Sequence, residues 1–316
     1  MMRVNPDVKY FCLVFILAAV TFGHLSIAYS QTIISEESSV FSGSGYKISV
    51  SEWITQGDFR MHGGPSGADN TWELTHPVDG GMTQLLLAYT EEKNSPYIVN
   101  ISLSAGNVRQ DTIRDTDWDE YGVITDLSYS TVKGNTYGFS FSTDYRVTDL
   151  REPYEFYITF GYNRLALSSD YQDAHIVIAD GAPVDIYAWQ DRKWQIYDLV
   201  YQGLEIGVKG KSEVSKGLLL SGSLGYMPFV YAEYKGTRYK GTILEADEHI
   251  VAYGTALTYE LALRYNMSGR FFVDGGYRYS AYRTEGEDQP GSAWAGAWEE
   301  LDTDFKGFFF GCGLKF

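Results

Sequence analysis

The chain has 316 residues, with 41 acidic against 25 basic residues and a formal net charge of −16. Phosphate backbones repel so acidic a chain, which argues against nucleic acid as a partner, while its acidic loops favour cationic ligands. It also holds 26 Tyr, 17 Phe, 7 Trp and 33 Gly, a composition that with alternating segments is typical of membrane β-barrels.

Residues 1–30 have the pattern of a secretory signal peptide. Arg3 and Lys9 form a basic start, and the apolar run from Phe11 to Phe22 follows. This run is too short for a good membrane helix. We therefore expect the segment to direct secretion and to be removed.

The chain after the signal peptide keeps 23 basic and 40 acidic residues, a charge of −17. Its one cysteine is Cys312, so no internal disulfide can form. Residues 31–44 are rich in Ser and are expected to be a flexible lead-in. The rest, residues 45–316, is expected to be a single domain.

Period-two alternation predicts ten β-strands in this domain. The pattern is clearest where Tyr137, Phe139 and Phe141 share one face and Gly138 and Ser140 the other. The expected strands cover approximately residues 46–61, 82–89, 97–108, 137–147, 154–163, 194–209, 218–234, 253–265, 271–283 and 305–316. Short turns and long polar connections alternate between them.

One face of these strands is aromatic and the other carries charges and glycines, whereas a soluble sandwich has an aliphatic inner face and a polar outer one. An even strand number, lipid-facing aromatics and a polar interior are typical of bacterial outer-membrane proteins. The terminal Phe316 resembles their sorting signal. We predict an all-β, ten-stranded antiparallel transmembrane β-barrel of the Gram-negative outer membrane, with its long connections extracellular.

Two polar motifs lie in long connections expected on the extracellular side. Asp115 and Asp117 are two residues apart, as are Asp247 and His249, so each pair shares a face if extended. Two close carboxylates hold a proton between them near neutral pH, and an Asp-oriented imidazole can deprotonate water. Metal ligation is the competing chemistry, but metal-binding spacings are absent and no metal is expected.

The Asp-x-Asp-Trp at 115–118 and the Asp-Glu-His at 247–249 resemble the motifs of the omptins, outer-membrane proteases of Gram-negative bacteria. The resemblance covers most of the chain after residue 46. It implies an aspartic-type endopeptidase in which the Asp-His pair activates water and the Asp-Asp pair helps to hold it. The implied catalytic residues are Asp115, Asp117, Asp247 and His249.

The same resemblance implies peptide or protein substrates with basic residues, for which Glu245 would be an acidic binding residue. No cofactor is expected. Outer-membrane lipid is expected as a partner. Omptins need lipopolysaccharide, which they bind through basic residues. Ala166 and Leu199 stand where two of the omptin arginines would align, so dependence on lipopolysaccharide is not predicted. Two alternatives remain open: an inactive omptin-like barrel acting as an adhesin or structural protein, and a small porin.

Overall fold

The computed structural model describes residues 45–64, 72–90, 95–119, 121–148, 154–240, 243–292 and 297–316. Side chains are described at these positions except 189–194, 239–240 and 243–246. The expected signal peptide and lead-in lie outside this part of the chain. No helix in the described residues is long and apolar enough to cross a membrane.

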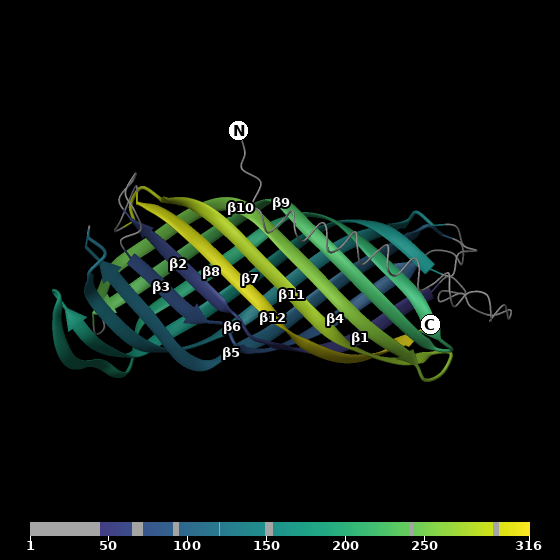
Figure 1. The fold of residues 1–316 in the computed structure, drawn as a ribbon, viewed down its shortest axis with the longest axis horizontal. Coiled ribbons are helices and arrows are strands. Elements are labelled where there is room, and N and C mark those ends of the chain that lie inside the picture. The colour runs from purple at the N-terminus through teal and green to yellow at the C-terminus, as the bar shows by residue number, and fades with distance from the viewer. Residues whose placement is uncertain are drawn as a thin grey trace.

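The described chain is an all-β barrel made from one closed antiparallel sheet (Figure 1). Closure comes from the pairing of the first segments with the last strand. Closing a sheet satisfies the backbone hydrogen bonds of its edges, as a structure in lipid requires. The strands are β1 (Gly45–Thr55), β2 (Asp58–Gly64), β3 (Trp72–Pro77), β4 (Gly80–Thr90), β5 (Tyr97–Trp118), β6 (Ile124–Arg146), β7 (Tyr154–Ala179), β8 (Ala182–Ser215), β9 (Leu218–Lys240), β10 (Ile243–Asn266), β11 (Phe271–Asp288) and β12 (Trp298–Lys315).

These twelve segments make ten strands around the circumference, which confirms the expected barrel. The reason is that β1 and β2 pair in succession with β12, and that β4 and β3 pair in succession with β5. The two breaks lie side by side, because the Val78 amide donates to the Gly57 carbonyl at 2.9 Å. The Gly57 amide in turn donates to Asp79 Oδ1 at 2.9 Å.

The outer wall carries a band of exposed apolar and aromatic side chains. Phe160, Leu204, Phe229 and Phe308 are all more than half exposed. Exposing such a surface to water would be costly, so lipid is its natural solvent. On β5 the band ends at Leu103 and on β10 it begins at Tyr253.

Beyond this band the strands continue to one end of the barrel, here called the mouth, which carries the β5–β6, β7–β8, β9–β10 and β11–β12 connections (Figure 1). The expected polar connections at 109–135, 179–193, 235–250 and 284–304 are therefore mostly strand, and β3 occupies part of the expected loop at 62–81. Beyond the band the outward side chains no longer need to be apolar, so the aromatic alternation stops although the hydrogen-bonded ladder continues.

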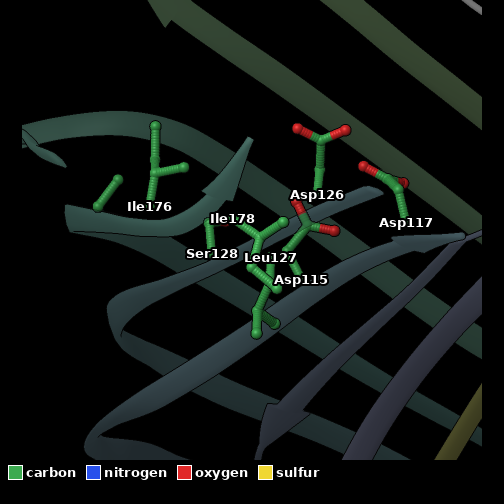
Figure 2. A pocket seen from close by; sticks show the side chains of 8 residues that line it. Asp115, Asp117, Asp126, Leu127, Ser128, Ile176 and Ile178 are labelled. Carbon is green, nitrogen blue, oxygen red and sulfur yellow. The ribbon is translucent and has the colours of Figure 1, made fainter. Parts of the chain in front are cut away.

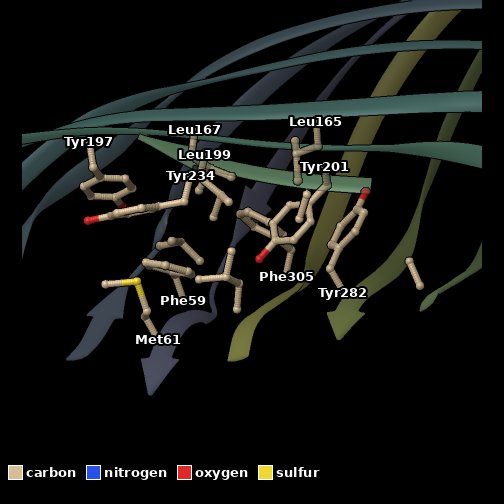
Figure 3. Close-up of a cluster of buried hydrophobic side chains, with 14 of the residues drawn as sticks. Phe59, Met61, Leu165, Leu167, Tyr197, Leu199, Tyr201, Tyr234, Tyr282 and Phe305 are labelled. Carbon is tan, nitrogen blue, oxygen red and sulfur yellow. The ribbon is translucent and has the colours of Figure 1, made fainter. Parts of the chain in front are cut away.

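The interior beneath the mouth is filled by an aromatic cluster of Phe59, Tyr197, Tyr201, Tyr234 and Tyr282 (Figure 3). Phe59 stacks on Tyr197 with ring centroids 5.7 Å apart, and Tyr201 stacks on Tyr282 at 4.6 Å. Offset stacking of this kind adds to the gain from burial. The cluster ties the β2 wall to the β8, β9 and β11 walls.

Ion pairs fill the interior on the other side of the aromatic cluster. Arg264 binds Asp274 at 2.7 Å and Arg278 binds Glu260 at 2.6 Å. The Arg146 guanidinium lies over the Tyr157 ring at 5.8 Å.

Candidate functional site

Two carboxylates of the Asp-x-Asp-Trp motif lie on the inner wall of the mouth. They are in phase with Ile113, which is 1% exposed and faces the interior. Across the strand pair Asp115 is opposite Ser128 and Asp117 is opposite Asp126 on β6. Like charges directly opposite each other repel, so strand pairing alone gathers three carboxylates on one wall.

These carboxylates border an open cavity of about 230 Å³ at the mouth (Figure 2). Its other side is apolar and comes from β6 and β7. Figure 2 shows the carboxyl groups of Asp115, Asp117 and Asp126 gathered on one side and Ile176 on the other. The full lining is Asp115, Asp117, Asp126, Leu127, Ser128, Ala174, Ile176 and Ile178.

The second motif presents a different residue to the interior from those expected. Glu248 is 7% exposed, and its carboxylate accepts hydrogen bonds from Arg238 at 3.1 Å and from the Tyr234 hydroxyl at 3.4 Å. Tyr234 belongs to the aromatic cluster, so this face of β10 is the inner one. Glu248, for which the sequence suggested no role, therefore faces the interior.

Asp247 and His249 consequently lie on the outer face of β10, because successive side chains of a strand point to opposite faces. Asp247 is exposed, and the His249 ring contacts Glu233 Oε1 at 3.0 Å. Glu233 also binds Lys235, whose side chain is 58% exposed. The fold thus brings Asp115 and Asp117 together but does not bring Asp247 and His249 to the same side of the wall.

The alternation of β10 decides which residues of the second motif point inward. Glu248 alternates in step with the buried Ile250 and Ala252. The pairing of β10 with β9 shifts between Leu244 and Ala246, but this bulge lies before the motif and does not alter its faces. The side chain of Glu245 itself is outside the described part, so its expected substrate role stays a prediction.

The charge state of Asp115 is the most unusual property of the mouth. The residue lies twelve positions beyond Leu103 on β5, outside the apolar band. Burial, and next the charge of Asp117, raise the pKa of Asp115 to about 7, with Glu248 adding to the rise and Arg238 opposing it. Burial and the charge of Asp126 also raise the pKa of Asp117. Asp115 is therefore close to half protonated at neutral pH.

The opposite wall carries two further buried acids that the sequence reading missed. Asp288 on β11 and Glu299 on β12 are each 3% exposed. Burial, followed by the charges of Asp288 and Glu248, raises the pKa of Glu299 to about 9, so this carboxyl is neutral at pH 7. Strand alternation was the one feature of the sequence that could have indicated them. Glu299 lies two residues before Leu301, which faces inward, so the two side chains share the inner face. Acidic residues therefore line both walls of the mouth.

The positions aligned with the lipid-binding arginines of the omptins give a mixed result. Leu199 is fully buried in the interior, so it cannot meet lipid. Ala166 alternates with the buried Leu165 and Leu167 and so faces outward.

Comparison with known proteins supports the fold alone. A closed antiparallel barrel with an apolar outer band defines the bacterial outer-membrane β-barrel class. Within that class the fold is similar to that of the outer-membrane protease OmpT of Escherichia coli, which superposes with a TM-score of 0.69, covering 89% of this chain and 100% of that chain at 13% identity.

Other barrels match less well. The translocator domain of the autotransporter NalP from Neisseria meningitidis gives a TM-score of 0.32 at 11% identity, covering 97% of this chain and 98% of that chain. No family model matches the sequence, and no curated protein matches it.

Proposed function

We propose that the chain is an outer-membrane endopeptidase of omptin type, with its mouth facing the outside of the cell, that hydrolyses peptide bonds near basic residues. The omptin-type barrel and the acid-lined mouth support this proposal. The observation that carries it is the pairing of Asp115, whose pKa is raised to about 7, with Asp117 on the same face of β5.

The chemistry needs one protonated and one ionised carboxyl group. Side chains two residues apart on a strand start about 7 Å from each other, which leaves room for a water and a peptide carbonyl. Ionised Asp117 takes a proton from the water as its oxygen bonds to the carbonyl carbon, and protonated Asp115 hydrogen-bonds the carbonyl oxygen. The carbon–nitrogen bond then breaks, and the amine leaves with a proton returned by the acid pair.

The cavity suits a lysine or arginine side chain of the substrate. Ile176 and Ile178 offer apolar contact to its methylene stem, while Asp117 and Asp126 attract its charged end. Such a charge would also favour the ionised form of Asp117. Binding of a basic side chain and activation of the base are therefore coupled.

The omptin resemblance gives the water-activating role to Asp247 and His249 and a substrate role to Glu245. In our proposal Asp117 takes the base role, because His249 hydrogen-bonds Glu233 on the outer face of β10. Glu248 and Arg238 act on the pKa of Asp115 from across the barrel. Glu245 is kept as a candidate specificity residue.

The direct test uses full-length protein refolded in detergent, with and without added lipopolysaccharide. We expect cleavage of a peptide with paired arginines and no cleavage of the same peptide with paired glutamates. Mass spectrometry of the products locates the cut. Absence of cleavage in both lipid conditions by protein that circular dichroism shows to be folded would refute the endopeptidase.

A second candidate is an inactive omptin-like barrel that binds basic peptides as an adhesin. It is favoured by the outward position of Asp247 and His249, the pair to which the resemblance assigns catalysis. Retained binding of the arginine peptide without cleavage would support this candidate. The porin is less well supported, because the aromatic cluster fills the interior.

Two substitutions near Asp115 should shift the pH dependence of activity in opposite directions. Activity requires protonated Asp115, so kcat/KM should fall as pH rises through about 7. Glu248→Gln removes a negative charge, which lowers the pKa of Asp115 and moves this fall to lower pH. Arg238→Gln removes a positive charge and moves it to higher pH. Profiles of kcat/KM against pH report these shifts for the free enzyme; shifts of the same sign, or none, contradict the assignment.

A further inference from the structure

Three side chains with metal-binding atoms meet on the outer wall of the barrel, on strands β2 and β12. They are His62, Glu300 and Asp302, and one ligand atom from each lies within 4.8 Å of the others. We propose that they bind a divalent transition-metal ion such as Zn²⁺. The proposal is independent of the endopeptidase, since Glu299 and Leu301 of the same strand face inward and these two acids face outward.

Strand pairing fixes the geometry of this group. Glu300 is directly opposite His62, and Asp302 is two residues further along the same face. His62 Nε2 lies 2.8 Å from Glu300 Oε2. All three side chains are between 19% and 33% exposed, so an ion from solution can reach them while the strand pair holds them in place.

The surroundings of the group carry an excess of negative charge. Along the row of facing residues Glu73 is opposite His62, and Glu285 is opposite Glu300 on β11. Facing carboxylates destabilise a sheet, and a bound cation between them reverses that effect. Arg283 contacts Asp302 through Nε at 3.3 Å but is shared with Asp304 at 2.7 Å.

The donor set selects the class of ion. One imidazole nitrogen with two carboxylate oxygens suits Zn²⁺ and its neighbours, whereas Mg²⁺ and Ca²⁺ prefer oxygen ligands alone. Water would complete the coordination. The ion would replace the His62–Glu300 contact and join β2 to β12, so its binding should stabilise the fold through mass action.

The test is isothermal titration of the refolded full-length protein with ZnCl₂, with thermal unfolding as a second readout. We expect one Zn²⁺ per chain and a higher Tm with Zn²⁺ but not with Mg²⁺. His62→Ala and Glu300→Gln should each weaken binding at least tenfold and remove the Tm shift. The second variant keeps the side-chain shape, so it remains informative if the first folds poorly.

A matched control is available in His175, which contacts Asp185 at 2.9 Å on the β7–β8 hairpin. It is also a histidine–carboxylate pair, but it is not part of the three-residue group. His175→Ala should bind Zn²⁺ as the wild type does. Absent binding in the wild type, or equal binding by wild type and His62→Ala, overturns the proposed site.

Discussion

Asp115→Asn should lower kcat/KM for an arginine-containing peptide by about 10²–10⁴-fold, the range that a positioned acid or base contributes. An amide has the shape of the acid but cannot pass a proton to the departing amine. Asp117→Asn should cost a similar factor because it removes the base. Steady-state cleavage of a fluorogenic peptide near neutral pH measures both losses, and circular dichroism checks folding.

The control for this prediction is His249→Ala, because His249 lies on the outer face of β10 and contacts Glu233. It should keep most of the wild-type activity. The omptin resemblance predicts the opposite, a loss as large as that of Asp115→Asn. An inactive His249→Ala beside an active Asp115→Asn would show that catalysis belongs to the Asp-His pair.

The largest loss of stability is expected from Phe59→Ala, which should lower the free energy of unfolding by about 3–5 kcal/mol. Phe59 is fully buried and stacks on Tyr197 and Tyr234, while the His76 ring meets its edge. Its removal leaves a cavity between walls that are far apart in sequence. Equilibrium unfolding by urea in lipid vesicles measures the change.

Tyr121→Ala serves as the matched aromatic control, since Tyr121 is 81% exposed in the β5–β6 turn. It should change the free energy of unfolding by less than about 0.5 kcal/mol. Equal losses in the two variants would show that the aromatic cluster does not hold the walls together.

The barrel could be predicted because lipid imposes a pattern on sequence. Segments 137–147 and 154–163 alternate aromatic with small or charged residues, and both are strands. The limits of the strands were harder, since Asp115 and its neighbours continue β5 without any apolar face. The breaks at Gly57, between β1 and β2, and at Val78–Asp79, between β3 and β4, had no period-two signal either. These breaks are fixed by hydrogen bonds between segments distant in sequence.

The candidate site, like the barrel, could be predicted only in part from the sequence. The phase of β5 places Asp115 and Asp117 on one face, as expected. The Asp247 and His249 side chains, expected on the opposite wall, lie on the outer face of β10. The inward position of Glu248 continues the alternation of the strand expected at 253–265, whose even-numbered residues such as Ala256 and Ala262 also face inward. The raised pKa of Asp115 depends on burial beneath other strands, a tertiary property that spacing does not encode.

The aromatic cluster affects whether molecules can pass through the interior of the barrel. Phe59 and Tyr201 are fully buried in this cluster, so packed side chains form a floor beneath the mouth. In the endopeptidase proposed above, peptide fragments would leave by the opening through which the peptide entered. Such a barrel can act on molecules outside its membrane while leaving the permeability barrier intact.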